Sequence, residues 1–224
     1  MAPEKIKVPF GFYMVLEGGE GCGKSTQRKL LVQRLLKDGY DVFDKELREP
    51  GTTPAGEAIR SILLSSDFGL NPETQAFLYL AARADVFPKV INPALDNGQV
   101  VVADRSGLST KSYQGYAGGV NLGFIDKANA IALRGRTYSF GIIIDVNHEN
   151  ALEKIAQERK LDDMERKGLE FHKKVNEGYR EIVRQDPPRF SLVKYREGNI
   201  QGMADEIYQI TKDRIDKAIA QRSK

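Results

Sequence analysis

The sequence predicts an α/β fold in which a parallel, five-stranded sheet carries helices on both faces. Three observations support this prediction. Short apolar runs alternate with longer segments whose apolar residues recur at helical spacing. A glycine-rich turn joins the first apolar run to the first helical segment, and two later runs each end in an aspartate. Strands that alternate with helices in this way form parallel sheets that helices cover on both sides.

Composition limits what kind of protein this is. No repeat or linker-like stretch divides the 224 residues, so we expect one domain over residues 1–224. Apolar residues make up 41% and charged residues 29%, and no apolar run is long enough to span a bilayer. The net charge of +3 does not favour nucleic acid as a partner. A single cysteine, Cys22, excludes an internal disulfide and fits a cytoplasmic setting.

The first half of the chain is expected to alternate three strands with three helices. Asn71 and Pro72 supply a helix cap and a first-turn proline, and Pro88 or Pro93 is expected to bend the helix that follows. Strands are expected at residues 12–16, 40–43 and 100–103, and helices at 25–37, 54–64 and 72–95.

The second half continues the alternation. A buried strand over residues 142–144 ends at Asp145, and a last strand and a last helix close the chain. Ligands of such sheets bind at the carboxyl ends of the strands, so the informative residues should follow the strands. Helices are expected at about 149–158, 163–184 and from 201, and the last strand at 191–195.

Residues 18–25 match the G-x-x-x-x-G-K-[ST] phosphate loop in full, after an expected strand and before an expected helix. This predicts a P-loop NTPase-type fold that binds ATP. Backbone amides and the helix N-terminus hold phosphate, Lys24 lies near the β- and γ-phosphates, and Ser25 binds Mg²⁺. The expected ATP-binding residues are Gly18, Gly19, Glu20, Gly21, Cys22, Gly23, Lys24, Ser25 and Thr26.

Asp104 ends a strongly apolar strand, where an acid that holds Mg²⁺ through water is expected. Asp145 also ends a strand and is the alternative. We favour Asp104 because Arg105 follows it, so that a magnesium acid and a phosphate-binding base stand side by side.

A second group of residues suggests a second anionic substrate. An enzyme that brings two polyanions together needs arginines beyond the phosphate loop, and Arg48, Arg83 and Arg105 are the candidates. Tyr79 and Arg83 are four residues apart on one helix face, which suits a flat base. The alternative for this pair is a packed aromatic ring beside a surface arginine.

Four segments together resemble the thymidylate kinase family in its bacterial form, from Phe12 to about Tyr179. The phosphate loop in the first segment is generic, whereas REPG and the DR…LST…YQG pattern, in this order, are far more specific. The segments are EGGEGCGKS at 17–25, REPG at 48–51, FLYLAAR at 77–83 and DRSGLSTKSYQG at 104–115.

The resemblance implies transfer of the γ-phosphate of ATP to dTMP, giving dTDP and ADP for dTTP synthesis, with Mg²⁺ as cofactor. It also implies a homodimer built from helices beside the sheet. Its catalytic residues would be Glu20, Lys24, Arg105 and Arg159, and its metal site Ser25 and Asp104. The implied dTMP contacts are Glu20 at the 3′-hydroxyl, Arg48 and Arg105 at the phosphate, Tyr79 stacked on thymine, Arg83 on the base, Thr110 and Gln114 at the thymine edge, and Tyr113 at the sugar 2′ position.

Three features depart from the family pattern. Ser106 stands where the family usually has tyrosine or histidine, and residues 116–119 lack an arginine. The short lid is expected at 157–166, where Asp163 takes the place of a base. Arg159 is then the lid residue expected to meet the transferring phosphoryl group.

Other functions remain open from the sequence alone. A kinase with a different nucleoside or nucleotide acceptor would share the phosphate loop. A P-loop switch or partitioning ATPase would share it too, although no Asn-Lys-x-Asp motif is present. A relative without activity, acting as a binding module, is favoured only by the altered lid.

Overall fold

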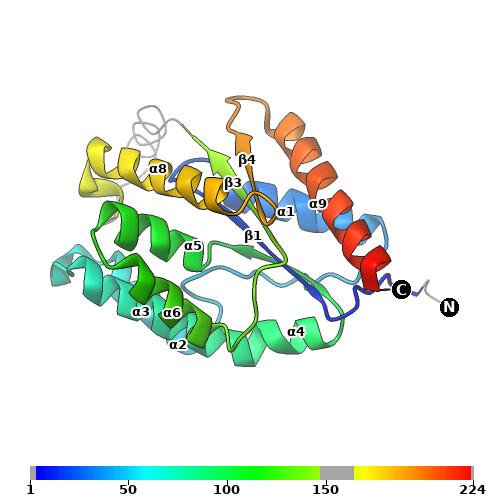
Figure 1. Ribbon diagram of the computed structural model, residues 1–224, viewed down its shortest axis with the longest axis horizontal. Coiled ribbons are helices and arrows are strands. Elements are labelled where there is room, and N and C mark those ends of the chain that lie inside the picture. Colours follow the sequence, from blue (N-terminus) through cyan, green and yellow to red (C-terminus); the bar gives the residue numbers. More distant parts are fainter. Residues whose placement is uncertain (1–3, 147–163, 223–224) are drawn as a thin grey trace.

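The computed structural model describes residues 4–146 and 164–222, and in these ranges four parallel strands form one sheet (Figure 1). The order across the sheet is β2-β1-β3-β4. Within β1, alternate side chains point to opposite faces, so Met14 and Leu16 join one core and Tyr13 and Val15 the other. The strands are β1 (Phe12–Gly18), β2 (Val100–Asp104), β3 (Phe140–Asp145) and β4 (Phe190–Lys194).

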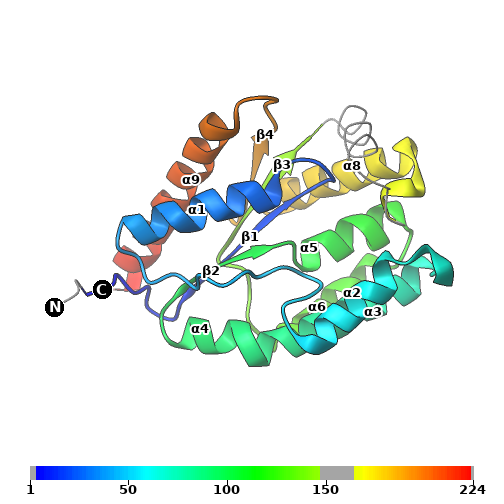
Figure 2. The ribbon, with the colours of Figure 1, turned by 180° about the vertical axis from the view of Figure 1, so that it is seen from behind.

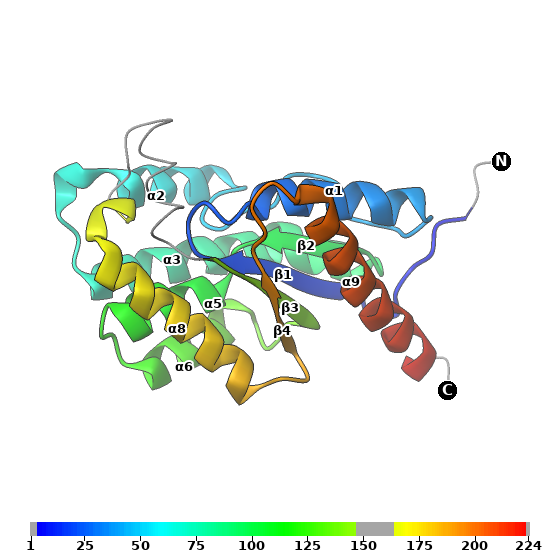
Figure 3. The same cartoon turned by 90° about the horizontal axis from the view of Figure 1, so that it is seen from above.

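Helices cover both faces of this sheet, as the sequence predicted. One face packs against α1 (Lys24–Lys37) and α9 (Ile200–Arg222), and α1 lies in front in Figure 2. Figure 3 shows the strands between α1 on one side and α8, α5 and α6 on the other. The helices beyond α1 and α9 are α2 (Pro54–Leu64), α3 (Pro72–Val86), α4 (Asn92–Asp96), α5 (Gly107–Thr110), α6 (Leu122–Ala132) and α8 (Leu169–Gln185), with wider π-type turns at Phe87–Ile91 and Lys111–Ala117 and 3-10 turns at Ser66–Phe68 and Glu165–Lys167.

The prediction of a fifth strand at residues 40–43 is wrong. In the described part of the chain these residues do not form a continuous strand. Val42 pairs with Val100 and, further along, Arg48 pairs with Asp104, but each pairing is an isolated bridge. Between these two bridges, the buried side chain of Arg28 makes hydrogen bonds to the backbone in place of strand pairing. Its Nε donates to the carbonyl of Val102 at 2.7 Å, and its Nη2 donates to that of Lys45 at 2.6 Å. The edge strand is therefore interrupted because a guanidinium occupies the gap.

Other elements follow the sequence with shifted ends. The long helix expected over 72–95 divides at Pro88, where the missing N–H of proline coincides with the π-type turn. The helix expected from residue 163 begins only at Leu169, and the one expected at 149–158 lies outside the described residues. Both α5 and α6 were missed. None of the helices in the described ranges combines the length and the apolar character that crossing a membrane requires.

The Arg28 bridge predicts a measurable loss of stability. Replacing Arg28 by methionine keeps the volume but leaves the Val102 carbonyl buried without its donor, so we expect the free energy of unfolding to fall by about 2 kcal/mol. Urea unfolding measures this. The matched control is Lys29→Met, which changes an exposed neighbour on α1 and should shift stability by less than about 0.5 kcal/mol. Equal effects from the two substitutions would contradict the bridging role.

Candidate functional site

A cavity of about 400 Å³ opens where β1 and β2 end, and we call it the phosphate cavity. Its floor is the glycine-rich loop, and its walls come from α2, the residues after β2, and the segment before α8. The lining residues are Glu20, Gly21, Gly23, Lys24, Ser25, Thr26, Glu46, Arg48, Glu49, Arg60, Asp104, Arg105 and Glu165.

The loop's glycines are required by its backbone. Gly23 has φ of 78° at the start of α1, a left-handed conformation that glycine adopts without strain. At Gly18, a Cβ would approach the carbonyl oxygen of Ile144 to 2.5 Å, so the loop passes too close to β3 for any side chain. Lys24 Nζ donates to the carbonyls of Gly18 and Gly19, at 3.1 and 2.7 Å, which holds the ammonium against the loop.

The residues expected to hold magnesium lie together. Ser25 Oγ donates a hydrogen bond to Asp104 Oδ2 at 2.5 Å. A hydroxyl and a carboxylate beside a phosphate loop are the hard oxygen ligands that Mg²⁺ prefers, so these residues fit the ion. The alternative acid, Asp145, instead pairs with Arg180 at 3.0 Å, on a different cavity. The geometry therefore favours Asp104.

Arg105 is the first residue after β2, and its side chain faces the phosphate loop. Its Nη2 pairs with Glu20 Oε1 at 2.5 Å, and the hydroxyl of Tyr113 donates to the same oxygen at 3.0 Å. Burial alone would raise the pKa of Glu20. The charges of Arg105 and Lys24, with the Tyr113 hydrogen bond, outweigh burial and hold that pKa at about 2.

Two further arginines face the phosphate cavity. Arg48 forms a two-pronged pair with Glu57, at 3.1 and 3.0 Å. Arg60 donates to the carbonyl of Pro50 at 3.3 Å, and both burial and the nearby charge of Arg48 lower its pKa. Sequence analysis missed Arg60. The available signal was its place on α2, directly after the REPG loop, which turns this helix back over the site.

A second, smaller cavity of about 80 Å³ adjoins the first, and we call it the acceptor cavity. Glu20, Arg60 and Arg105 line both cavities. Tyr79, Tyr113 and Gln114 also line the acceptor cavity. Its remaining lining residues are Pro50, Leu64, Ser109 and Met164.

Arg83 and Thr110 lie behind the wall of the acceptor cavity. Arg83 is 1% exposed and pairs with Glu49 at 2.7 Å between Nε and Oε2. Its Nη1 donates to Asn129 at 2.8 Å and its Nη2 to Thr110 at 3.4 Å. Burial raises the pKa of Glu49 although Arg83 opposes that shift. The structure thus groups Arg83 with Thr110, but not with the lining residues.

The expected lid is only partly described. Arg159 and Lys160 lie outside the described residues, and Arg166 is exposed. Just before α8, Glu165 lines the phosphate cavity and Met164 lines the acceptor cavity, so the end of this segment contacts both.

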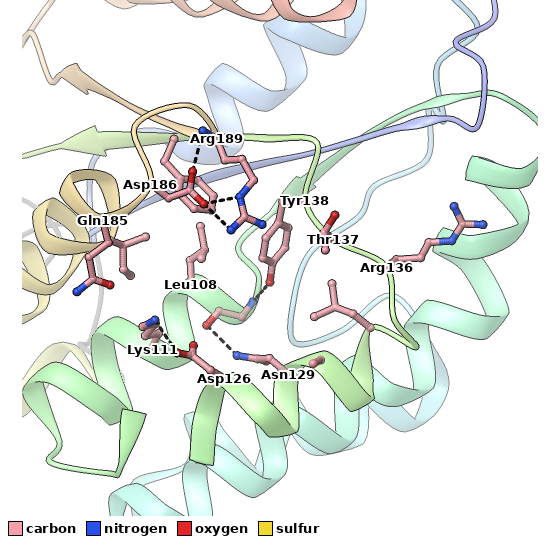
Figure 4. Close-up of a pocket in the computed structure, with 15 residues that line it drawn as sticks. Leu108, Lys111, Asp126, Asn129, Arg136, Thr137, Tyr138, Gln185, Asp186 and Arg189 are labelled. Carbon is pink, nitrogen blue, oxygen red and sulfur yellow. Dashed lines mark hydrogen bonds and ion pairs between the residues drawn. The ribbon is translucent and has the colours of Figure 1, made fainter. Parts of the chain in front are cut away.

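A third cavity, of about 390 Å³, lies on the far side of α5 and shares no lining residue with the other two (Figure 4). Four of its charged side chains pair within the cavity, Lys111 with Asp126 at 2.8 Å and Arg189 with Asp186, while Arg136 pairs with Asp96 outside the lining. This cavity is separate from the phosphate loop.

Comparisons with known proteins agree on one family. A family model described as thymidylate kinase matches residues 16–207. A thymidylate kinase from Caldanaerobacter subterraneus is 43% identical over 82% of this chain and 86% of its own length. One from Synechococcus sp. strain JA-3-3Ab is 39% identical over 92% of this chain and 98% of its own. The crystal structure of thymidylate kinase from Ehrlichia chaffeensis superposes with a TM-score of 0.73 at 26% identity, covering 90% of this chain and 98% of that one.

The low pKa of Glu20 predicts a pH-dependent contribution to stability. The pKa of Glu20 is about 2 in the folded protein, against an ordinary value of 4.5 for this side chain. The stabilisation from ionised Glu20 is therefore fully present above pH 4.5 and is lost as pH falls toward 2. We expect Glu20→Gln to lower the free energy of unfolding by about 2 kcal/mol at neutral pH, and by progressively less from about pH 5 to about pH 3. Urea unfolding across this range measures the difference, with the exposed Glu73→Gln as control. A pH-independent difference would contradict the assignment.

Proposed function

The chain belongs to the thymidylate kinase family, and we propose that it transfers the γ-phosphate of ATP to dTMP, giving dTDP and ADP for dTTP synthesis. The observation that supports this most is the pair of adjoining cavities, which share Glu20, Arg60 and Arg105. One cavity is floored by a phosphate loop and the other is lined by aromatic and amide side chains. Two anionic substrates can therefore meet across a shared set of charges.

ATP occupies the phosphate cavity in this proposal. The loop amides and the N-terminus of α1 bind its phosphates, and Lys24 presents a charge to the β- and γ-phosphates. Ser25 and Asp104 would hold Mg²⁺, whose charge, when bound, offsets that of the phosphates. Arg159 is proposed to meet the transferring phosphoryl group. It belongs to the expected lid at 157–166 and itself lies outside the described residues. The whole of residues 1–224 is proposed to be one kinase domain.

The phosphate of dTMP lies at the junction of the two cavities, where Arg48, Arg60 and Arg105 supply cations. Glu20 is proposed to accept the sugar 3′-hydroxyl, because it already accepts a hydroxyl from Tyr113 at 3.0 Å. Tyr113 then fills the space beside the sugar 2′ position, which favours deoxyribose.

Thymine lies against Tyr79 in the acceptor cavity. Gln114 supports this placement, because its buried Oε1 has no hydrogen-bond partner among the described residues while its Nε2 donates to Gln75 at 3.3 Å. An unpaired acceptor suits the N3–H of a pyrimidine. Arg83 and Thr110, which do not line the acceptor cavity, are proposed to support its wall at the thymine edge.

The chemical step is in-line displacement. A phosphate oxygen of dTMP attacks the γ-phosphorus, the bond between that phosphorus and the β–γ bridging oxygen breaks, and ADP leaves. The acceptor phosphate is already ionised near neutral pH, so no general base is required. Lys24 and Arg105 are placed to offset charge as the phosphoryl group passes between the oxygens.

This assignment predicts strict dependence on the acceptor. ADP should form from ATP and Mg²⁺ only when dTMP is present. Thymidine in place of dTMP, or omission of the acceptor, should not support ADP formation. Arg105→Ala should lower kcat/KM for dTMP by at least about a hundredfold. The control is Arg184→Ala, whose guanidinium pairs with acids on the surface of α8. ATP turnover that is indifferent to every acceptor would favour a P-loop switch instead.

A homodimer is proposed to form through α3 and α6. Phe77 of α3 and Phe124 of α6 are 59% and 37% exposed, with ring centroids 5.3 Å apart. Ile131 of α6 is 78% exposed. An exposed apolar patch of this kind supports an interface at this place, and the family resemblance favours a second copy of the chain as its occupant. We also propose that the enzyme acts in the cytoplasm.

The dimer proposal predicts that a charge on this patch separates the protomers. Phe77→Glu should shift the molar mass in light scattering from that of a dimer to that of a monomer, because burying the carboxylate is costly. Ile200→Lys, at the exposed start of α9, should leave the dimer intact. A monomeric wild type would contradict the proposal.

A further inference from the structure

Glu17 is a wholly buried carboxylate that lines neither the phosphate cavity nor the acceptor cavity. It lies on β1, one residue before the phosphate loop begins. Its Oε1 accepts from Ser106 Oγ at 2.6 Å and from Ser109 N at 3.3 Å. Its Oε2 accepts from Ser109 Oγ at 2.6 Å and from the hydroxyl of Tyr179 at 2.8 Å. A buried carboxylate persists only when its oxygens are satisfied in this way.

The four donors are all neutral, so this carboxylate does not form one half of a simple ion pair. They come from the turn after β2, from α5 and from α8. Glu17 therefore joins β1 to the elements that carry the residues after Asp104. Because the carboxylate accepts the proton of each hydroxyl group, it determines the direction in which each hydroxyl points.

Ser109 is the hydroxyl that matters for the site. A serine hydroxyl has one proton and two lone pairs. Because its proton is directed to Glu17 Oε2, its lone pairs are left to accept. One of them accepts from Arg105 Nη1 at 3.2 Å. Without the carboxylate, the hydroxyl of Ser109 could turn its proton toward Tyr179, 2.9 Å away, or toward Arg105.

Arg105 needs such a support. Its backbone has φ of 68°, which is uncommon for a residue with a side chain, and its guanidinium lies between the two cavities. Nη1 also faces the carbonyl of Gly18 at 3.4 Å and the hydroxyl of Tyr113 at 3.5 Å, both longer than the contact with Ser109. The Ser109 contact is thus the shortest one that fixes this side of the guanidinium, while Nη2 faces Glu20.

We propose that Glu17 is a positioning residue for the kinase reaction: through Ser109 it fixes the plane of the Arg105 guanidinium against the phosphate of the acceptor. This rests on the proposed function, because it assigns Arg105 to the nucleoside monophosphate. Glu17 touches neither substrate. Through Arg105 it affects how the acceptor is bound. It does not affect the binding of ATP, whose phosphates are bound by the loop.

The experiment measures kcat and the KM values for dTMP and ATP, with melting temperatures, for the full chain. Glu17→Gln should lower kcat/KM for dTMP about tenfold and leave the KM for ATP within about twofold. Ser109→Ala should do the same, and Ser109→Thr, which keeps the hydroxyl, should restore most of the loss. In the Ser109→Ala background, Glu17→Gln should add no further loss, because both substitutions break one path.

Tyr179→Phe is the matched control. It removes a donor from the same Oε2, but within the described part of the chain Tyr179 makes no hydrogen bond to Arg105, so the substitution should lower the melting temperature while leaving the KM for dTMP within about twofold. If Glu17→Gln does not fold, Glu17→Asp keeps the charge while drawing it back from Ser109, and the same pattern is expected. Additive losses, equal losses for ATP and dTMP, or an unchanged kcat/KM for dTMP in Ser109→Ala would overturn the inference. A wild type without dTMP-dependent ADP formation would instead contradict the proposed function.

Discussion

The site depends on one constraint, the in-register parallel pairing of β1 and β2. Leu16 lies opposite Asp104, and the amide of Arg105 continues the ladder by donating to the carbonyl of Leu16 at 3.0 Å. β2 therefore ends opposite Leu16, two residues before β1 ends at Gly18. The phosphate loop and the Asp104–Arg105 pair thus leave the same edge of the sheet from neighbouring strands, and the Ser25–Asp104 hydrogen bond follows from that adjacency. A shift of one residue would separate the phosphate loop from Arg105.

The site's cations are held by groups of the protein itself. Lys24 is bonded to loop carbonyls, Arg48 to Glu57 and Arg105 to Glu20. These contacts keep the side chains close to where phosphate oxygens are proposed to lie. Binding then exchanges one set of partners for another and leaves few long side chains to be ordered, which lowers the entropic cost of assembling two polyanions.

The sequence predicted the elements whose signals are local. Pro54 marked the start of α2, and Asn71 accepts from the amide of Thr74 at 2.8 Å, as its position before a helix implied. What it missed depends on contacts distant along the chain. The Arg28 bridge needs carbonyls 74 and 17 residues away, and no periodicity reports them.

The same limitation applies to Arg83 and Arg60. Arg83 had Tyr79 on the same helix face and suited a binding face, yet it lies buried beside Glu49, while Arg60, which the sequence did not single out, faces the cavities. Spacing decides which residues share a face of a helix, but the REPG loop decides which face meets the ligand. The roles within the site, and those in the lid beyond the described ranges, remain predictions of the family resemblance.

Glu17 and Glu20 show how neighbours separate the roles of two carboxylates three residues apart on the chain. Glu20 faces the shared cavity and pairs with Arg105 Nη2, whereas Glu17 is enclosed and reaches Nη1 through Ser109. The two carboxylates thus hold the guanidinium from opposite sides. If a sugar hydroxyl engages Glu20, the pairing on Nη2 weakens, but the support on Nη1 does not involve the substrate. Arg105 can then exchange its exposed partner for phosphate without losing its orientation, because the buried partner stays in place.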